Sequence, residues 1–148
     1  MSYHTWSTDG FGFCVDDIKT TPERVLKLAA LNEETLNDLR EYLDAIYEDG
    51  YKDKDLTMDD FSDFEGNYGE HGLSTILREV IEKELPIVFA DDFDCVNYIL
   101  YCPSYPWTLH EKEKSLTKDD VEEILTKYIK ILTDESIDID FYSVENGG

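Results

Sequence analysis

Basic residues are scarce in this sequence. Only 13 Lys and Arg stand against 35 Asp and Glu, so the formal net charge is −22 at pH 7. Proteins hold nucleic acids and anionic membranes mainly through Lys and Arg, so this balance disfavours direct binding to either. A protein partner with a basic surface is favoured instead, and its capture should be fast and sensitive to salt.

Cysteine is also sparse, with Cys14, Cys95 and Cys102 as its only positions. An odd and low number of cysteines is typical of reduced thiols rather than of a disulfide scaffold. The three cysteines and three histidines have no paired spacing of the kind that zinc sites use. No basic segment precedes an apolar run at the start, and no apolar run approaches the length of a membrane span. We therefore expect a cytoplasmic protein that needs no cofactor.

The common catalytic motifs are absent from the sequence. It contains no G-x-S-x-G, no glycine-rich phosphate loop and no H-E-x-x-H, which favours a protein that is not an enzyme. The segment 53–64 begins like a calcium-binding EF-hand loop. However, its sixth position is Met58 rather than Gly and its twelfth is Phe64 rather than Glu, so the match fails.

The composition nevertheless predicts a folded domain. Hydrophobic residues make up 41% and aromatic residues 13% of the 148 residues, which disordered acidic chains do not reach. Apolar periodicity predicts helices that begin at Pro22, over 33–48, over 73–85 and after a Thr117 cap. The fold class is α+β, an antiparallel sheet of about four or five strands with about four helices packed mainly on one face. We expect one domain over 1–148, with a long acidic loop at 51–71 and a short tail at 145–148.

The strands are predicted from turn signals and alternation. Asp9-Gly10 is typical of a tight hairpin turn, which would fold residues 2–17 into two strands. The alternative is one long strand with a glycine bulge at 10–12. A second hairpin is expected over 87–90 and 95–102, whose later strand is apolar on both faces and therefore central. The segment 136–144 is predicted to be an edge strand.

Acidic side chains form a row on the helix predicted over 33–48. They recur every three or four residues along about 21 Å of helix, and like charges at that spacing destabilise a helix. The row resembles a phosphate backbone in charge and spacing. It is either a solvated helix face or a mimic that occupies a basic cleft. Its members are Glu34, Asp38, Glu41, Asp44 and Glu48.

Further partner-binding residues are predicted in two loops. The acids Asp59, Asp60 and Asp63 extend the negative surface. Exposed aromatic side chains would supply the desolvated anchor that charge alone does not provide. For Tyr105 and Trp107 the alternative is that they cover an edge of the core. The aromatic candidates are Phe61, Phe64, Tyr105 and Trp107.

In size, acidity and aromatic content the chain resembles small acidic proteins of phages and mobile elements that block host defence, of the anti-CRISPR or anti-restriction type. It is also similar to acidic immunity proteins that neutralise nucleases. The likeness is one of overall character and carries over no functional residue. It implies that this chain acts as a DNA mimic and inhibits a nuclease or another nucleic-acid enzyme.

Two other functions remain open at this point. One is a metal-assisted hydrolase that uses Asp16, Asp17 and Lys19, or the acids of 91–94. The other is an acidic subunit of a larger assembly. The favoured hypothesis is a non-enzymatic protein that inhibits or regulates a basic, nucleic-acid-handling partner.

Overall fold

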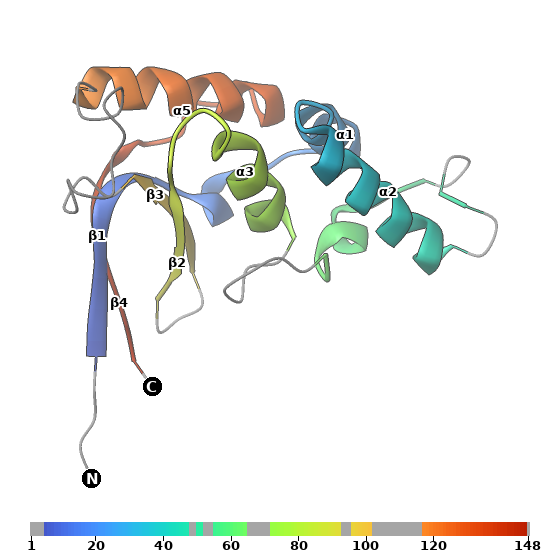
Figure 1. Ribbon diagram of the computed structural model, residues 1–148, viewed down its shortest axis with the longest axis horizontal. Helices are drawn as coiled ribbons and strands as arrows, with labels where there is room; N and C mark the ends of the chain where they lie inside the picture. The colour runs from blue at the N-terminus through green and yellow to red at the C-terminus, as the bar shows by residue number, and fades with distance from the viewer. Residues whose placement is uncertain are drawn as a thin grey trace, which may run out of the picture.

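The chain forms an α+β fold, as its sequence predicts. The computed structural model describes residues 5–47, 50–51, 55–64, 72–92, 96–101 and 117–147. Within them lie four helices and four strands, together with two short 3-10 turns (Figure 1). The helices are α1 (Pro22–Ala29), α2 (Glu33–Ile46), α3 (Leu73–Ile81) and α5 (Lys118–Leu132); the strands are β1 (Thr5–Cys14), β2 (Val88–Asp91), β3 (Asn97–Tyr101) and β4 (Asp140–Gly147); the 3-10 turns are η1 (Val15–Asp17) and η2 (Met58–Phe61).

The sheet is antiparallel, and its strand order is β2-β3-β1-β4. The predicted hairpin at Asp9-Gly10 is wrong, because β1 continues as one strand through both residues. It pairs with β4 from Thr5–Gly147 to Gly12–Asp140 in an unbroken register, so there is no bulge either. A long partner strand gives every one of these residues a neighbour, which outweighs the local turn preference of Asp-Gly. The side chain of Asp9 also accepts a hydrogen bond from Ser143 across the pair.

The other strands follow the predictions closely. β2 and β3 form the second hairpin, and β3 lies between β2 and β1. Asp92 closes the connection, since its carboxylate accepts from the N–H of Val96 at 3.0 Å. β4 lies at the sheet edge as expected, but it runs through Gly147, so the expected tail is wrong over 145–147.

The helix starts are set by capping side chains. Thr21 accepts from the N–H of Arg24 at the start of α1, with Pro22 in the first turn. Thr117 and Asp120 form the capping box that begins α5. α3 ends at Ile81, earlier than its apolar pattern predicts, because Pro86 prevents continuation and residues 82–85 form turns.

The core lies mainly between the helices and one face of the sheet. Phe13 and Ile99 from the sheet pack in one cluster with Leu28, Leu77 and Leu125 from three helices. The opposite face carries a smaller cluster of Ala90, Leu100 and Val144. No helix in the described ranges has both the length and the apolar composition to cross a membrane.

Gly12 is required where β1 meets β3. A Cβ atom at this position would lie 1.9 Å from the carbonyl oxygen of Ile99, which is far inside van der Waals contact. Both groups belong to the backbone of paired strands, so neither can move aside alone. The pairing of β1 with β3 therefore depends on the missing side chain.

We predict that Gly12→Ala lowers the free energy of unfolding by about 3 kcal/mol or more, the upper end of overpacking effects, because the strands must separate. Urea unfolding followed by circular dichroism measures this loss. The control Ser136→Ala changes an exposed residue and should shift stability by less than about 0.5 kcal/mol. An unchanged unfolding midpoint for Gly12→Ala would contradict the close approach of the strands.

Candidate functional site

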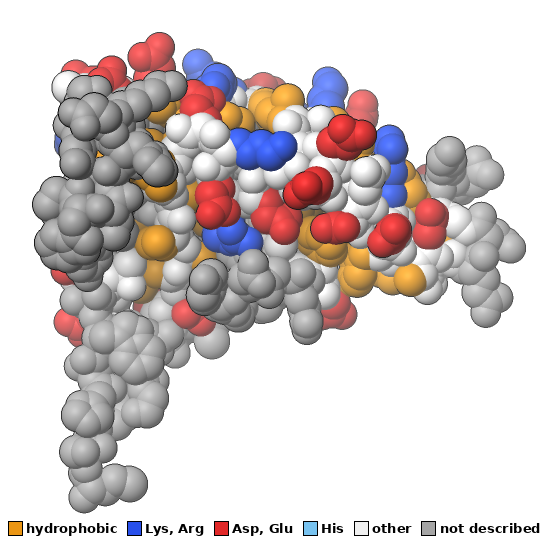
Figure 2. Space-filling model, viewed as in Figure 1, with side chains coloured by type: hydrophobic (Ala, Val, Ile, Leu, Met, Phe, Trp, Pro, Cys, Tyr) orange, Lys and Arg blue, Asp and Glu red, His pale blue; other side chains and the backbone are white. Residues whose placement is uncertain are grey.

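Helix α2 presents the acidic row predicted from the sequence. Its residues Leu39 and Leu43 are fully buried, whereas Glu34, Asp38 and Glu41 are exposed. With 3.6 residues per turn, these three acids fall on the side of the helix away from the core. Figure 2 shows acidic side chains following one another across the surface that α2 forms in Figure 1. Among the described residues, none of the three acids forms an ion pair.

The first turn of α2 is fastened to α3 by a polar network. The amide oxygen of Asn32 accepts from the N–H groups of Glu34 and Thr35, at 3.1 and 3.4 Å. Its amide nitrogen donates to the carbonyl of Glu79 at 3.1 Å, and the Thr35 hydroxyl donates to the Glu79 carboxylate at 3.1 Å. Asn32 and Thr35 are both buried, so these bonds are shielded from water. The acidic row therefore begins on a firmly placed helix.

Two acids of the predicted surface hold the chain together locally. The carboxylate of Asp44 accepts from the N–H of Tyr51 at 3.2 Å. Asp60 accepts from the N–H of Thr57 at 2.8 Å and from the Tyr47 hydroxyl at 2.9 Å. The bond to Asp60 raises the pKa of Tyr47 because it stabilises the protonated phenol. Asp44 and Asp60 therefore stabilise the local fold as hydrogen-bond acceptors. Glu48, the last acid of the predicted row, lies outside the described residues.

The expected aromatic anchors in this region are wrong. Phe61 is 1% exposed and Phe64 is 6% exposed, and both belong to the main core. The ring of Phe64 packs against Tyr42, with 5.5 Å between centroids. In η2, Phe61 lies inward and Met58 and Asp60 are half-buried, whereas Asp59 is exposed. Tyr105 and Trp107, the other two candidates, lie outside the described residues.

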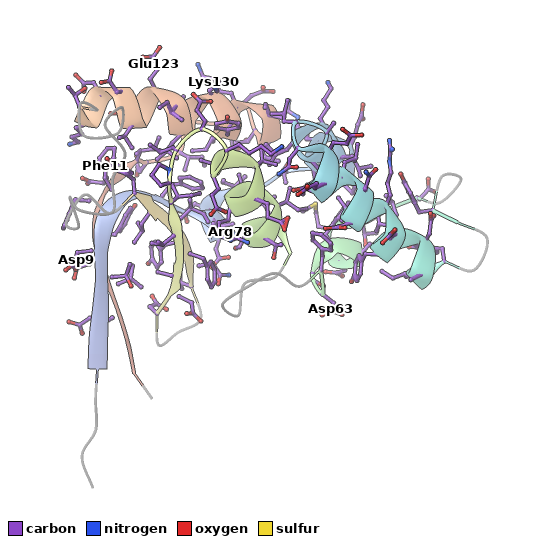
Figure 3. All side chains as sticks on the ribbon, viewed as in Figure 1. Asp9, Phe11, Asp63, Arg78, Glu123 and Lys130 are labelled. Atoms are coloured by element: carbon purple, nitrogen blue, oxygen red, sulfur yellow. The ribbon has the colours of Figure 1, made fainter. Side chains whose placement is uncertain are left out.

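The outward acids in and just after this turn are Asp59 and Asp63. Both are exposed, and Figure 3 shows Asp63 on the lower side of the molecule beside η2. They add negative charge to the surface beside η2. The three free acids of α2 therefore remain the best-defined part of the candidate surface.

Helix α5 provides a contrast with α2. Acids and bases alternate along its outer side, where Figure 3 places Glu123 and Lys130. Lys127 pairs with Glu84, which also accepts from the Tyr128 hydroxyl at 2.6 Å. Burial, together with this bond, raises the pKa of Tyr128. Charge on α5 is thus largely compensated, while the row on α2 is not.

Among the residues considered for metal chemistry, Asp16 has a structural partner. Asp16 accepts from the backbone and side-chain nitrogens of Asn97, at 3.1 and 3.3 Å. Burial raises the pKa of the Cys14 thiol, which disfavours the reactive thiolate. In the part of the chain that the structure describes, no three His, Cys, Asp or Glu side chains lie together as metal ligands would. The three histidines and Asp94 lie outside it.

Comparison with known proteins adds no relative. No protein-family model matches the chain, and neither a curated protein nor a solved structure is detectably similar to it. The function must therefore be argued from the residues themselves.

The structural role of Asp60 can be separated from surface charge. We predict that Asp60→Ala lowers the free energy of unfolding by about 1–2 kcal/mol, because the cap of η2 and the Tyr47 bond are lost. Asp59→Ala removes the same charge from an exposed neighbour and should change stability by less than about 0.5 kcal/mol. Thermal and urea unfolding of the two variants measure the difference. Equal effects would mean that charge, and not the hydrogen bonds, governs stability here.

Proposed function

We propose that this chain is a non-enzymatic binding protein that inhibits or regulates a basic, nucleic-acid-handling partner. The observation that carries the proposal is the row formed by Glu34, Asp38 and Glu41. These three carboxylates are exposed and without ion pairs among the described residues, on a chain with a net charge of −22. They would lie where the partner otherwise holds phosphates.

The spacing supports partial mimicry of a nucleic acid. Successive acids of the row are about 4.5–6 Å apart along the helix axis, whereas phosphates recur about every 3.4 Å along the axis of one DNA strand. The charge density is thus somewhat lower than that of a single strand. Binding by this row alone should depend less steeply on salt than DNA binding to the same cleft.

The energetic argument concerns the free protein. Each pair of like charges three or four residues apart destabilises a helix by about 0.2–0.5 kcal/mol. α2 tolerates this repulsion because its buried face and the Asn32 network hold it in place. Cations on a partner would relieve this repulsion, and the relief would contribute to the free energy of binding.

The proposal predicts that the triple variant Glu34→Lys, Asp38→Lys and Glu41→Lys loses its partner while keeping its fold. The matched control reverses Glu122, Glu123 and Glu135, which are exposed acids elsewhere. Each triple reversal adds six charge units, from −22 to −16, so the two variants share one net charge. Circular dichroism checks the fold, because Lys in the first turn of α2 costs about 0.3–1 kcal/mol.

The measurement is capture of partners from lysates of candidate hosts at low salt. Elution uses a salt gradient followed by short duplex DNA. Recovery of a nucleic-acid enzyme that DNA displaces, by wild type and control but not by the α2 variant, is the expected result. Equal loss in both variants would show that only net charge matters, and a partner that resists DNA would contradict phosphate mimicry.

A further inference from the structure

β4 is the longer of the two edge strands in the part of the sheet that the structure describes. The strand order β2-β3-β1-β4 leaves β2 and β4 at its two ends. β2 has only four residues and begins two residues after Pro86, whereas β4 has eight residues, no proline, no lysine and no bulge in its pairing with β1. Short strands, proline, lysine and bulges are the usual devices that keep other chains from pairing with an edge. The outer edge of β4 has none of them and is open to a further strand.

The alternation of hydrogen bonds across the sheet shows which backbone groups lie on this edge. In an antiparallel sheet, each residue bonds to one neighbouring strand, and successive residues alternate between the two. The N–H of Asp92 donates to the carbonyl of Val96 at 3.1 Å, so these two residues are a hydrogen-bonded pair. Counting from that pair through the registers of β3 and β1 places Tyr142 among the residues that bond to β1. The residues of β4 whose N–H and C=O groups point away from the sheet are therefore Phe141, Ser143 and Glu145.

A bond at the start of β4 agrees with this alternation. The carboxylate of Asp140 accepts from the N–H of Phe141 at 2.8 Å, in an exposed position. That N–H is therefore not used in the pairing with β1. Among the described residues, no segment outside the sheet bonds to the backbone of Ser143 or Glu145. A row of unpaired N–H and C=O groups is what an added strand binds.

The two faces of β4 differ in their side chains. On one face Val144 is buried, and the ring of Tyr142 packs against Tyr98 with 5.2 Å between centroids. On the other face Phe141 is 61% exposed, more than any other large hydrophobic side chain in the described residues. A strand along this edge would cover part of the Phe141 ring. The edge therefore offers an apolar contact in addition to its backbone groups.

The charge around β4 selects the kind of strand that fits. Asp138, Asp140 and Glu145 are exposed, form no ion pair among the described residues, and no Lys or Arg follows Lys130 in the sequence. A second copy of this chain would bring another net charge of −22 to the same edge, which disfavours pairing of two β4 strands. Opposite charges across a strand pair stabilise it. The fitting partner is therefore a basic segment.

We propose that the outer edge of β4 binds an extended segment of a basic protein, which joins the sheet as a further antiparallel strand. Its backbone bonds to Phe141, Ser143 and Glu145. Its Lys or Arg side chains lie opposite Asp140 and Glu145, and an apolar side chain lies opposite Phe141. Figure 1 shows β4 and α2 at opposite ends of the molecule, so this edge is separate from the acidic row and its binding does not depend on the proposed function.

The test is an NMR titration of the full chain with the peptide KVTVFK, whose ends are blocked. Paired antiparallel to β4, it places its lysines opposite Glu145 and Asp140 and its phenylalanine opposite Phe141. We expect the amide signals of Phe141, Ser143 and Glu145 to shift and the amides of Ser143 and Glu145 to exchange more slowly with solvent. The control peptide EVTVFE should bind about tenfold more weakly, because like charges would then lie opposite each other.

Methylation of single peptide nitrogens separates strand addition from simple charge attraction. In the paired peptide, the N–H of the threonine points toward β4, whereas the N–H of each valine points away. N-methylation at the threonine should weaken binding about tenfold or more, because a hydrogen bond is lost and the methyl group meets the edge. N-methylation at the second valine leaves the charge and the contacts with β4 unchanged and should have little effect.

Variants of the protein test the same contacts. Asp140→Lys combined with Glu145→Lys should favour EVTVFE over KVTVFK, while Glu122→Lys combined with Glu123→Lys, with the same net charge, should keep the wild-type preference. Ser143→Pro removes an outward N–H and should abolish binding while the fold survives, as circular dichroism would show. The triple variant of α2 should bind KVTVFK about as well as wild type does, so failure of one proposal can be told from failure of the other.

The proposal is overturned if the three amides do not move at about 5 mM peptide, a concentration that reveals millimolar affinity. Equal binding of the two N-methylated peptides would show that no strand is added, and equal binding of EVTVFE would show that charge plays no part. A free chain that sediments as a dimer, with a monomeric Ser143→Pro variant, would assign the edge to a second copy instead.

Discussion

The pairing of β1 on both of its edges is the constraint on which the rest of the fold depends. β1 joins β3 to β4, and without it the sheet would separate into a hairpin and a single strand. The same strand supplies Phe11 and Phe13 to the core beneath the helices. Gly12 lies between these two residues, and its lack of a side chain lets β3 approach. One short segment therefore sets both the sheet and the surface on which the helices pack.

The second constraint is the charge. A net charge of −22 makes the compact state repel itself, and the chain meets part of this cost by using acids as hydrogen-bond acceptors. Asp60 and Asp120 each accept the backbone N–H of a capping threonine. At Asp120 that bond lowers the pKa of the carboxyl group, so its stabilising effect is present above its ordinary pKa and is lost as the pH falls through the lowered value. Glu34, Asp38 and Glu41 form no such bond among the described residues, and these are the acids that the proposed partner would contact.

Local signals predicted the fold class, the caps and the second hairpin well. Thr117 with Asp120, and Thr21 with Pro22, are short-range patterns whose energy lies within one turn of helix. Asp9-Gly10 was misleading because its turn preference is also local, whereas the competing interaction is with a strand more than 130 residues away. No sequence pattern near Asp9 predicts its pairing with β4.

The candidate site was predictable in part for the same reason. Helical spacing alone placed Glu34, Asp38 and Glu41 on one exposed face. The burial of Phe61 and Phe64 could not be read from the segment 51–71, because it has no regular period. The burial of these two rings emerges only when distant segments are brought together.

The turn η2 fixes the end of α2. Phe61 is buried in the main core, while Asp60 accepts a hydrogen bond from the Tyr47 hydroxyl at the end of α2. The start of α2 is fixed by the Asn32 network to α3, so the acidic row lies on a helix that is held at both of its ends.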